Sequence, residues 1–267
     1  MKSFEQKCAI PLDSNTIRQH LNSPSTPIEL FESLGSTNDY LKESGNTLRV
    51  CLAESQTAGR GRLERPWHSP FGKNIYCSMR FPLTKKAHEL SGLSLVVGLA
   101  ICEAIEKIHP LPTPAQVKWP NDILIDDKKI AGTLIEINKD ALIIGIGVNI
   151  NMSEADINQP WTSLQKLTGV DHDRNFLCAQ LINHVTQYVG EFIKSDLSNF
   201  EKKWQTRDYL LGKEITLTCT NEKFTGVGSG INQHGHLVLT LPDGTNRAFL
   251  SGESTLLKQS NSILKKK

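Results

Sequence analysis

The chain has 267 residues, of which 38% are hydrophobic and 22% charged, as in an ordinary soluble globular protein. Its formal net charge is only +2, so the composition does not indicate a nucleic-acid or membrane partner, and any basic site must be local. No signal-peptide pattern opens the chain, and its longest apolar stretch, residues 92–101, is too short to span a bilayer. We therefore expect a cytoplasmic protein.

Residues 1–27 predict a short N-terminal segment that ends in a linker. Residues 13–21 have a helical pattern, and the prolines and small polar residues of 22–27 are typical of a linker. A segment of this length is too short for an independent DNA-binding domain, so we expect no DNA partner.

Strands and helices alternate over residues 28–211, which predicts a mixed α+β domain. Ser36 or Thr37 is suited to cap a helix, and the apolar spacing of residues 90–108 predicts a helix that packs across a sheet. The predicted strands are residues 28–33, 50–54, 74–81, 116–119, 123–125, 130–137 and 142–150. The later predicted helices are residues 162–168, 174–194 and 197–206.

The pattern changes at residue 212, where short alternating runs are separated by glycines. Such runs predict a small β-barrel domain over residues 212–258. A charged tail, residues 259–267, ends in three lysines and is expected to be solvated. The strands expected in the barrel are residues 213–219, 223–230, 236–241 and 245–250.

The loop of residues 59–67 contains three arginines, two glycines and a tryptophan, between strand-like residues 50–53 and 75–77. Guanidinium groups suit carboxylate or phosphate oxygens, and glycines allow positive φ and close approach of the backbone to a ligand. This composition indicates an anion-binding loop, although an ordinary solvated loop is an equally good interpretation of the segment alone.

A second unusual segment, residues 118–122, follows the strand of residues 116–119. It consists of a lysine, a tryptophan and a Pro-Asn-Asp turn, so the turn directs Lys118 to a fixed place. A surface lysine whose stem covers Trp119 is the competing interpretation. Small residues at 131–132, 145 and 147 interrupt two further strands, either for a flat ligand ring or for helix-on-sheet contact.

Cysteine and histidine spacing gives no sign of a metal site. The six cysteines are far apart without a C-x-x-C pair, and no H-E-x-x-H motif is present. We expect reduced core thiols, no catalytic cysteine and no zinc ligand.

Taken in order, five segments resemble the biotin protein ligase family over residues 28–257. The resemblance implies an α+β fold, in which a mixed-sheet ligase-like catalytic domain (residues 28–211) precedes a small SH3-like barrel (residues 212–258). It also implies the monofunctional type, which lacks an N-terminal DNA-binding domain and has no repressor function. The matching segments are residues 36–38, residues 56–62 with Arg65 and Trp67, residues 118–122, residues 129–132 and residues 147–151.

The activity that this resemblance implies is ATP-dependent attachment of biotin to a lysine of a biotin carboxyl carrier protein, through biotinyl-5'-AMP. The carrier would belong to acetyl-CoA carboxylase or a similar carboxylase. Mg²⁺ would be held through the phosphate oxygens of ATP more than by protein carboxylates, so no metal-binding residue is expected. The protein would be a monomer or a homodimer.

The resemblance also assigns roles to residues. Lys118, Arg60 and Arg62 are the implied catalytic residues. The implied biotin-binding residues are Ser36, Thr37, Asn38, Gln56, Gly59, Arg60, Arg62, Lys118, Ala131 and Gly132. The implied ATP-binding residues are Arg65, Trp67, Asn121, Asn149 and Trp161.

Two features depart from the family pattern, and two other functions remain open. Many relatives have a glycine near Glu64, and Pro66 precedes Trp67, so we expect a stiffer loop with a negative charge near phosphate. A lipoate or octanoate ligase would share the fold and the adenylate chemistry. A non-catalytic biotin-responsive binding protein would need a partner module that the sequence does not show.

Overall fold

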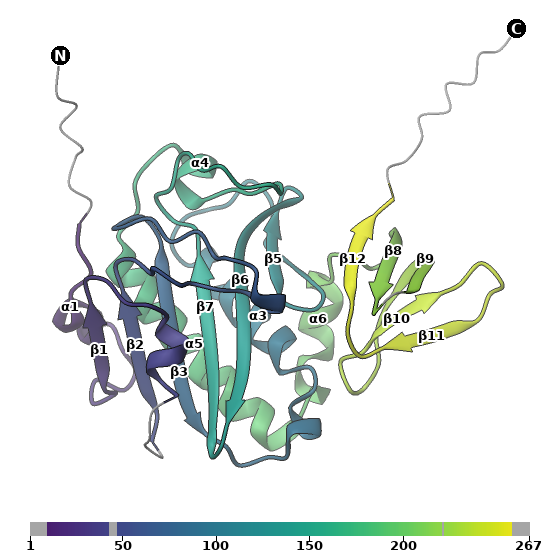
Figure 1. Cartoon of the computed structure of the whole chain (residues 1–267), viewed down its shortest axis with the longest axis horizontal. Coiled ribbons are helices and arrows are strands. Elements are labelled where there is room, and N and C mark those ends of the chain that lie inside the picture. Colours follow the sequence, from purple (N-terminus) through teal and green to yellow (C-terminus); the bar gives the residue numbers. More distant parts are fainter. Residues whose placement is uncertain (1–9, 43–46, 221, 258–267) are drawn as a thin grey trace, which may run out of the picture.

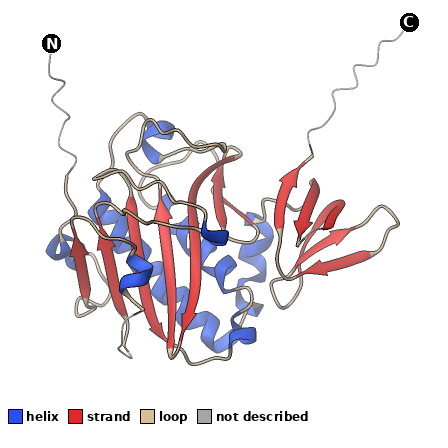
Figure 2. Ribbon diagram, in the orientation of Figure 1, coloured by secondary structure: helices blue, strands red, loops and turns tan. Residues whose placement is uncertain are grey.

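The computed structural model describes residues 10–42, 47–220 and 222–257, so Cys8 and the lysine-rich tail lie outside the described residues. Two sheets are present in this part of the chain, with helices on the larger one (Figures 1 and 2). The helices are α1 (Ser14–Gln19), α2 (Thr37–Tyr40), α3 (Leu93–Glu106), α4 (Leu164–Thr168), α5 (Arg174–Ser195) and α6 (Glu201–Arg207). The strands are β1 (Ile28–Phe31), β2 (Arg49–Ala53), β3 (Ile75–Pro82), β4 (Gln116–Lys118), β5 (Asp122–Ile125), β6 (Lys128–Asn138), β7 (Ala141–Val148), β8 (Glu214–Cys219), β9 (Glu222–Ile231), β10 (Leu237–Thr240), β11 (Asn246–Phe249) and β12 (Glu253–Leu256).

The larger sheet has the order β1-β2-β3-β7-β6-β5-β4. Its first pair is parallel and the other pairs are antiparallel, so the sheet is mixed, as expected. The long hairpin of β6 and β7 lies near the centre. The polar turn at residues 139–140 that joins these strands lets them pair directly along their full length.

Opposite faces of this sheet are covered by different elements, because side chains alternate along a strand. Val50 and Leu52 of β2 belong to the main core, which includes α3 and α5, whereas Cys51 belongs to a smaller core beside α2. Figure 2 shows the long helices together behind the sheet. The segment Ala87–Glu106 is long and apolar enough to cross a membrane by length and composition alone, but it is 67% buried inside the protein, as a core helix is.

The N-terminal segment is docked on the catalytic domain and is more than a linker. Leu12, Ile17 and Leu21 are buried. The buried guanidinium of Arg174, at the start of α5, donates to Glu54 at 2.6 Å and to the carbonyl of Ile10 at 2.9 Å. These bonds fix the end of β2, just before the loop of residues 56–72, which we call the arginine-rich loop.

The smaller sheet has the order β11-β10-β9-β8-β12 and is antiparallel, which confirms the expected SH3-like domain. Sequence analysis missed its last strand, because β12 is short and polar and is defined by pairing with β8. Trp119 Nε1 donates to the carbonyl of Gly235 at 3.1 Å, and Ser254 Oγ donates to the carbonyl of Trp119 at 3.4 Å. The barrel therefore packs directly against the segment of residues 118–122.

Candidate active site

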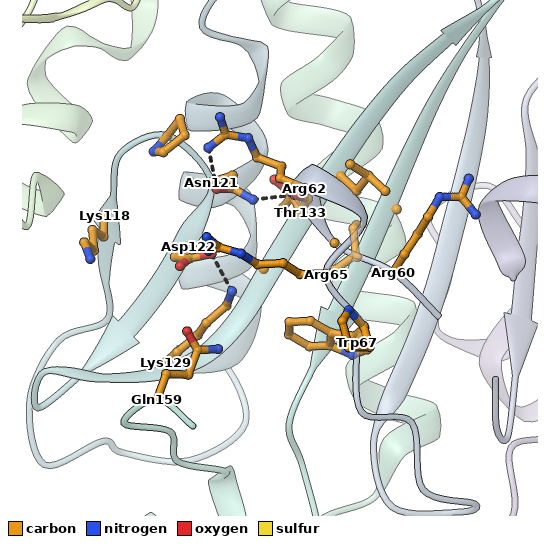
Figure 3. Close-up of a pocket in the computed structure, with 18 of the residues that line it drawn as sticks. Arg60, Arg62, Arg65, Trp67, Lys118, Asn121, Asp122, Lys129, Thr133 and Gln159 are labelled. Atoms are coloured by element: carbon orange, nitrogen blue, oxygen red, sulfur yellow. Dashed lines mark hydrogen bonds and ion pairs between the residues drawn. The ribbon is translucent and has the colours of Figure 1, made fainter. Parts of the chain in front are cut away.

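A cavity of about 270 Å³ lies between the sheet, the arginine-rich loop and the barrel (Figure 3). It brings together eleven of the fifteen residues that sequence analysis assigned to the site, from segments far apart in the chain. They are Ser36, Thr37, Asn38, Gln56, Arg60, Arg62, Arg65, Trp67, Lys118, Asn121 and Gly132.

The floor of the cavity is a row of glycines on the α2 face of the sheet. Gly132 of β6 pairs with Gly147 of β7, and Gly145 is two residues away on the same face. A β-carbon at Gly147 would lie 2.4–2.6 Å from the indole of Trp67, and one at Gly145 would lie 2.3 Å from Asn38 Oδ1. The glycines therefore permit close approach of side chains to the sheet.

One end of the cavity carries buried hydrogen-bonding side chains from the start of α2. The backbone N–H and the hydroxyl of Thr37 donate to Gln56 Oε1 at 2.9 and 3.1 Å. The hydroxyl of Ser78 lies 2.7 Å from Thr37 Oγ1 and 2.6 Å from Asn38 Oδ1. Ser36 accepts the N–H of Asp39 as N-cap, so the expected cap is confirmed. This end suits a neutral polar group.

The arginine-rich loop, residues 56–72, crosses the cavity as a tight hairpin. The N–H of Gly61 donates to the carbonyl of Arg65, and the N–H of Trp67 donates to the carbonyl of Gly59, both at 2.8 Å. Gly59 and Gly61, which would allow positive φ, do not adopt it, whereas Gly72 at the end of the loop does (φ 70°). Leu63 (φ 56°) and Glu64 (φ 55°) occupy the left-handed region instead. That region favours glycine, so Glu64 stands where a glycine would be least strained.

Glu64 forms a salt bridge with one of the cavity cations, Arg60. Its carboxylate is 87% exposed and 3.7 Å from Arg60 Nε. The negative charge that the sequence places in this loop therefore faces solvent and Arg60, rather than Arg62 or Arg65.

Five cations line the cavity, and they differ in their partners. Arg60, Arg65 and Lys129 form salt bridges, with Asp39, Glu253 and Asp122 respectively. Arg62 and Lys118 form no salt bridge with any residue in the described ranges. Arg62 Nη1 has a long contact of 3.5 Å with Asn121 Oδ1.

The unpaired cations are also the desolvated ones. Burial lowers the pKa of Lys118, and burial likewise lowers the pKa of Arg62. Asp122 and Glu253 offset part of this effect on both cations. A half-buried cation that forms no salt bridge gains from the arrival of an anion, so this end of the cavity suits a negatively charged ligand.

Four residues that the resemblance assigned to the site do not line the cavity. Gly59 packs against Gln56, and Ala131 is buried in the core. Asn149 donates to the carbonyl of Thr162 at 3.0 Å, and the ring of Trp161 lies 4.2 Å from Lys166 Nζ. The contacts of Asn149 hold the segment that carries Gln159 into the cavity, and the roles of Asn149 and Trp161 in ATP binding stay predictions.

Several lining residues were missed as site residues. Asp122 and Lys129 belong to the matching segments 118–122 and 129–132, but the 2.7 Å salt bridge between them is apparent only in the structure. Glu253 comes from the barrel, far away in sequence. The other missed lining residues are Gly61, Pro66, Trp119, Pro120, Thr133, Leu134, Gly145, Ile146, Gly147, Gln159, Gly252, Ser254 and Thr255.

Four of the five cysteines in the described ranges are buried and unsuited to catalysis at neutral pH. Burial raises the pKa of Cys51 to about 12 and that of Cys102 to about 12, and Cys77 and Cys178 are also buried. Within those ranges no three His, Cys, Asp or Glu residues are grouped as metal ligands.

This fold and this cavity define an α+β enzyme domain for a ligand with a polar hydrogen-bonding end and an anionic end. Residues 30–152 match the Biotin/lipoate A/B protein ligase family, and residues 210–253 match the Biotin protein ligase C terminal domain. The chain is 36% identical to the "Bifunctional ligase/repressor BirA" of Escherichia coli strain K12, over 86% of this chain and 74% of the relative. The chain therefore belongs to the biotin protein ligase family.

Solved structures give the same family. A biotin protein ligase from Aquifex aeolicus, in complex with biotin and ATP, superposes with a TM-score of 0.78 at 32% identity, over 87% of this chain and 99% of that one. A biotin protein ligase from Leishmania major, in complex with biotinyl-5-AMP, gives a TM-score of 0.53 at 28% identity, over 84% and 98%. The "Biotin--[acetyl-CoA-carboxylase] ligase" of Mycobacterium tuberculosis is 27% identical over 86% of this chain and 90% of that protein.

Proposed function

We propose that this protein attaches biotin to a lysine of a carboxylase carrier protein in an ATP-dependent reaction through biotinyl-5'-AMP. One observation carries the proposal: Arg62 and Lys118, two half-buried cations without salt bridges in the described chain, share a cavity with the hydrogen-bonding end beside α2. The Aquifex and Leishmania relatives were solved with biotin and ATP and with biotinyl-5-AMP, which supports the same chemistry.

The first step joins two anions. A carboxylate oxygen of biotin attacks the α-phosphorus of ATP, the bond to the β-phosphate oxygen breaks, and pyrophosphate leaves. Fixed cations that face both groups reduce their repulsion without reorganising, which is among the larger contributions to catalysis. We assign this role to Lys118 and Arg62.

The polar end of the cavity suits the neutral ureido group of biotin. Thr37 bonds to Gln56, and Ser78 bonds to both Thr37 and Asn38, before any ligand binds, so little side-chain entropy is lost on binding. The glycine row lets Trp67 and Asn38 lie close to the sheet, so these two side chains border this part of the cavity. Ser36 and Gly132 complete this end of the site.

The second step transfers the biotinyl group. The amine of the carrier lysine attacks the carbonyl carbon of the adenylate, the bond to the phosphate oxygen breaks, AMP leaves, and the amine loses a proton. Lys118 and Arg62 stay beside the departing phosphate and stabilise its charge.

Mg²⁺, which would neutralise triphosphate charge, is expected to arrive on ATP, because the cavity carboxylates Asp122 and Glu253 are both engaged in salt bridges.

Biotin-dependent exchange of pyrophosphate into ATP tests this function. We expect exchange with biotin and none with lipoate or octanoate, followed by ATP-dependent incorporation of biotin into a carrier domain. Exchange supported by lipoate instead would favour a lipoate or octanoate ligase. Tight binding of biotin with no exchange would leave a non-catalytic binding protein.

Arg62→Gln is predicted to slow adenylate formation by about 100-fold, because it removes one of two unpaired cations at the anionic end. The measurement is the maximal rate of pyrophosphate exchange. Arg65→Gln serves as the comparison, since Arg65 is 65% exposed and paired with Glu253, and a smaller effect, chiefly on the KM for ATP, is expected. Equal losses of maximal rate in both variants would contradict the distinction.

Partner, assembly and location are inferred less directly. The names of the mycobacterial and other relatives support a carboxylase carrier protein as the partner. The absence of a DNA partner, a monomeric or homodimeric state and a cytoplasmic location stay predictions. Size-exclusion chromatography with light scattering, with and without biotin and ATP, measures the assembly.

A further inference from the structure

Arg60 is the one loop arginine that is fully engaged with carboxylates. It binds both oxygens of Asp39, at 2.5 and 2.6 Å, and lies 3.3 Å from Glu136 Oε1. Lys42 joins the same two carboxylates at 2.8 and 2.9 Å. Arg60 and Lys42 therefore offset the charges of Asp39 and Glu136, the exposed Glu64 lies 3.7 Å from Arg60 Nε, and only 16% of the Arg60 side chain is exposed.

The charges of the cluster stabilise one another. Hydrogen bonds from Arg60 hold the pKa of Asp39 well below its usual range, and hydrogen bonds to Asp39 raise the pKa of Arg60. A guanidinium neutralised in this way has little charge left for a carboxylate or phosphate. In Figure 3 the guanidinium of Arg60 also points away from Arg62 and Arg65.

The cluster connects the loop to the polar end of the cavity. Asp39 directly follows Asn38 in α2, and Glu136 accepts a hydrogen bond from Asn38 Nδ2 at 2.7 Å. Asn38 is the side chain that packs on Gly145 of the cavity floor. The carboxylates that hold Arg60 thus also hold a residue of the proposed ureido site.

We propose that Asp39 and Glu136 are positioning residues that fasten the arginine-rich loop over the cavity through Arg60, and that Asn38 couples this latch to biotin. Arg60 then acts as the anchor of the loop, while Arg62 faces the reacting anions. The latch consists of Arg60, Asp39 and Glu136. The coupling to biotin rests on the proposed function, whereas the latch itself is a property of the unliganded chain.

The competing assignment has Arg60 contact the substrate directly, with Asp39 as an incidental surface partner. A double-mutant cycle separates the two, because residues that act only through each other give non-additive effects. The variants are Asp39→Asn, Arg60→Gln and the double variant. Glu29→Gln is the matched control: Glu29 also pairs with an arginine, Arg49, and accepts a bond from Tyr40 of α2, but it does not contact the loop.

The first readout is cleavage of the loop by chymotrypsin in the ligand-free protein, followed by mass spectrometry. Leu63, Trp67 and Phe71 are its sites in the loop, and none of the substitutions alters them. The second readout is the rate at which biotinyl-adenylate dissociates. Asp39→Asn and Arg60→Gln should each raise both rates about fivefold, as expected for loss of an ion-pair network of this exposure.

The cleavage and dissociation rates of the double variant should match those of either single variant. The rates of Glu29→Gln should match those of the unaltered protein. The maximal rate of pyrophosphate exchange in Asp39→Asn should change less than about twofold. Unchanged cleavage in Asp39→Asn, or effects that multiply in the double variant, would overturn the latch. Faster cleavage in Asp39→Asn, in a protein whose unaltered form shows no biotin-dependent exchange, would support the latch and reject the proposed function.

Discussion

Lys118→Ala is expected to slow formation of biotinyl-adenylate by about 10²- to 10³-fold while the fold stays intact, because a preorganised charge at the reacting anions is lost. Lys118 ends β4, and no described carboxylate forms a salt bridge with it, so its removal breaks no ion pair of the folded protein. The measurement is biotin-dependent pyrophosphate exchange, with circular dichroism and thermal unfolding to confirm the fold.

Lys128→Ala is the matched control, since Lys128 is exposed at the turn between β5 and β6 and should be silent. Near-normal exchange in Lys118→Ala would reject the assigned role.

A pH profile of biotin binding adds a second readout. Burial lowers the pKa of Lys118, so its ammonium loses a proton at a lower pH than an ordinary lysine does.

The affinity of the free enzyme for biotin should therefore fall on the alkaline side, below the pH at which an exposed lysine titrates. In Lys118→Arg the group stays charged over this range, so the alkaline fall should disappear even if the maximal rate is reduced. Persistence of the same alkaline limb in Lys118→Arg would assign the titration to another group. Isothermal titration of biotin at several pH values measures it.

Local patterns in the sequence led to eleven of the residues that line the cavity, because these patterns carry their own chemistry. The arginine-rich loop, the lysine that ends β4 and the paired glycines of β6 and β7 each stand out within a few residues. All three lie together in the cavity. The mixed sheet was likewise predictable from alternating apolar runs with short turns.

The features that sequence analysis missed depend on pairs of residues far apart in the chain. Asp39 and Glu136 are ordinary acidic residues in isolation, and only folding brings both to Arg60. Glu253 reaches Arg65 across 188 positions. The left-handed backbone at Leu63 and Glu64 was assigned to the neighbouring glycines, because composition shows which residues tolerate that region but not which ones adopt it.

The three loop arginines therefore have different surroundings in spite of their similar sequence context. Arg60 is neutralised by two carboxylates on the sheet side, and Arg65 is paired with the barrel. Arg62, between them, is half-buried and forms no salt bridge in the described chain. A loop held at both ends with a free cation in the middle can present that cation at a fixed place, which is what electrostatic catalysis requires.

Gly147→Ala is expected to raise the KM for biotin by about 10- to 100-fold, the range that overpacking by one methyl group in a well-packed site can cause. The added β-carbon would lie 2.4–2.6 Å from the indole of Trp67. Gly147 is paired with Tyr76 on one side and Gly132 on the other, so its backbone cannot retreat. The indole must move instead, and steady-state kinetics with biotin as the varied substrate measures the result.

The control is Gly190→Ala in α5, where no atom lies within 4 Å of the new β-carbon and alanine favours the helix. The cause is tested by adding Trp67→Ala. If displacement of the indole is the whole effect, the double variant should behave like Trp67→Ala alone, because the clash has no second partner. Trp67 Nε1 is buried without a hydrogen-bond partner among the described residues, so no hydrogen bond of the indole opposes this movement. A double variant with a KM for biotin far above that of Trp67→Ala would contradict this cause. The added methyl group would then act on the sheet or on the ligand directly, and not through the indole.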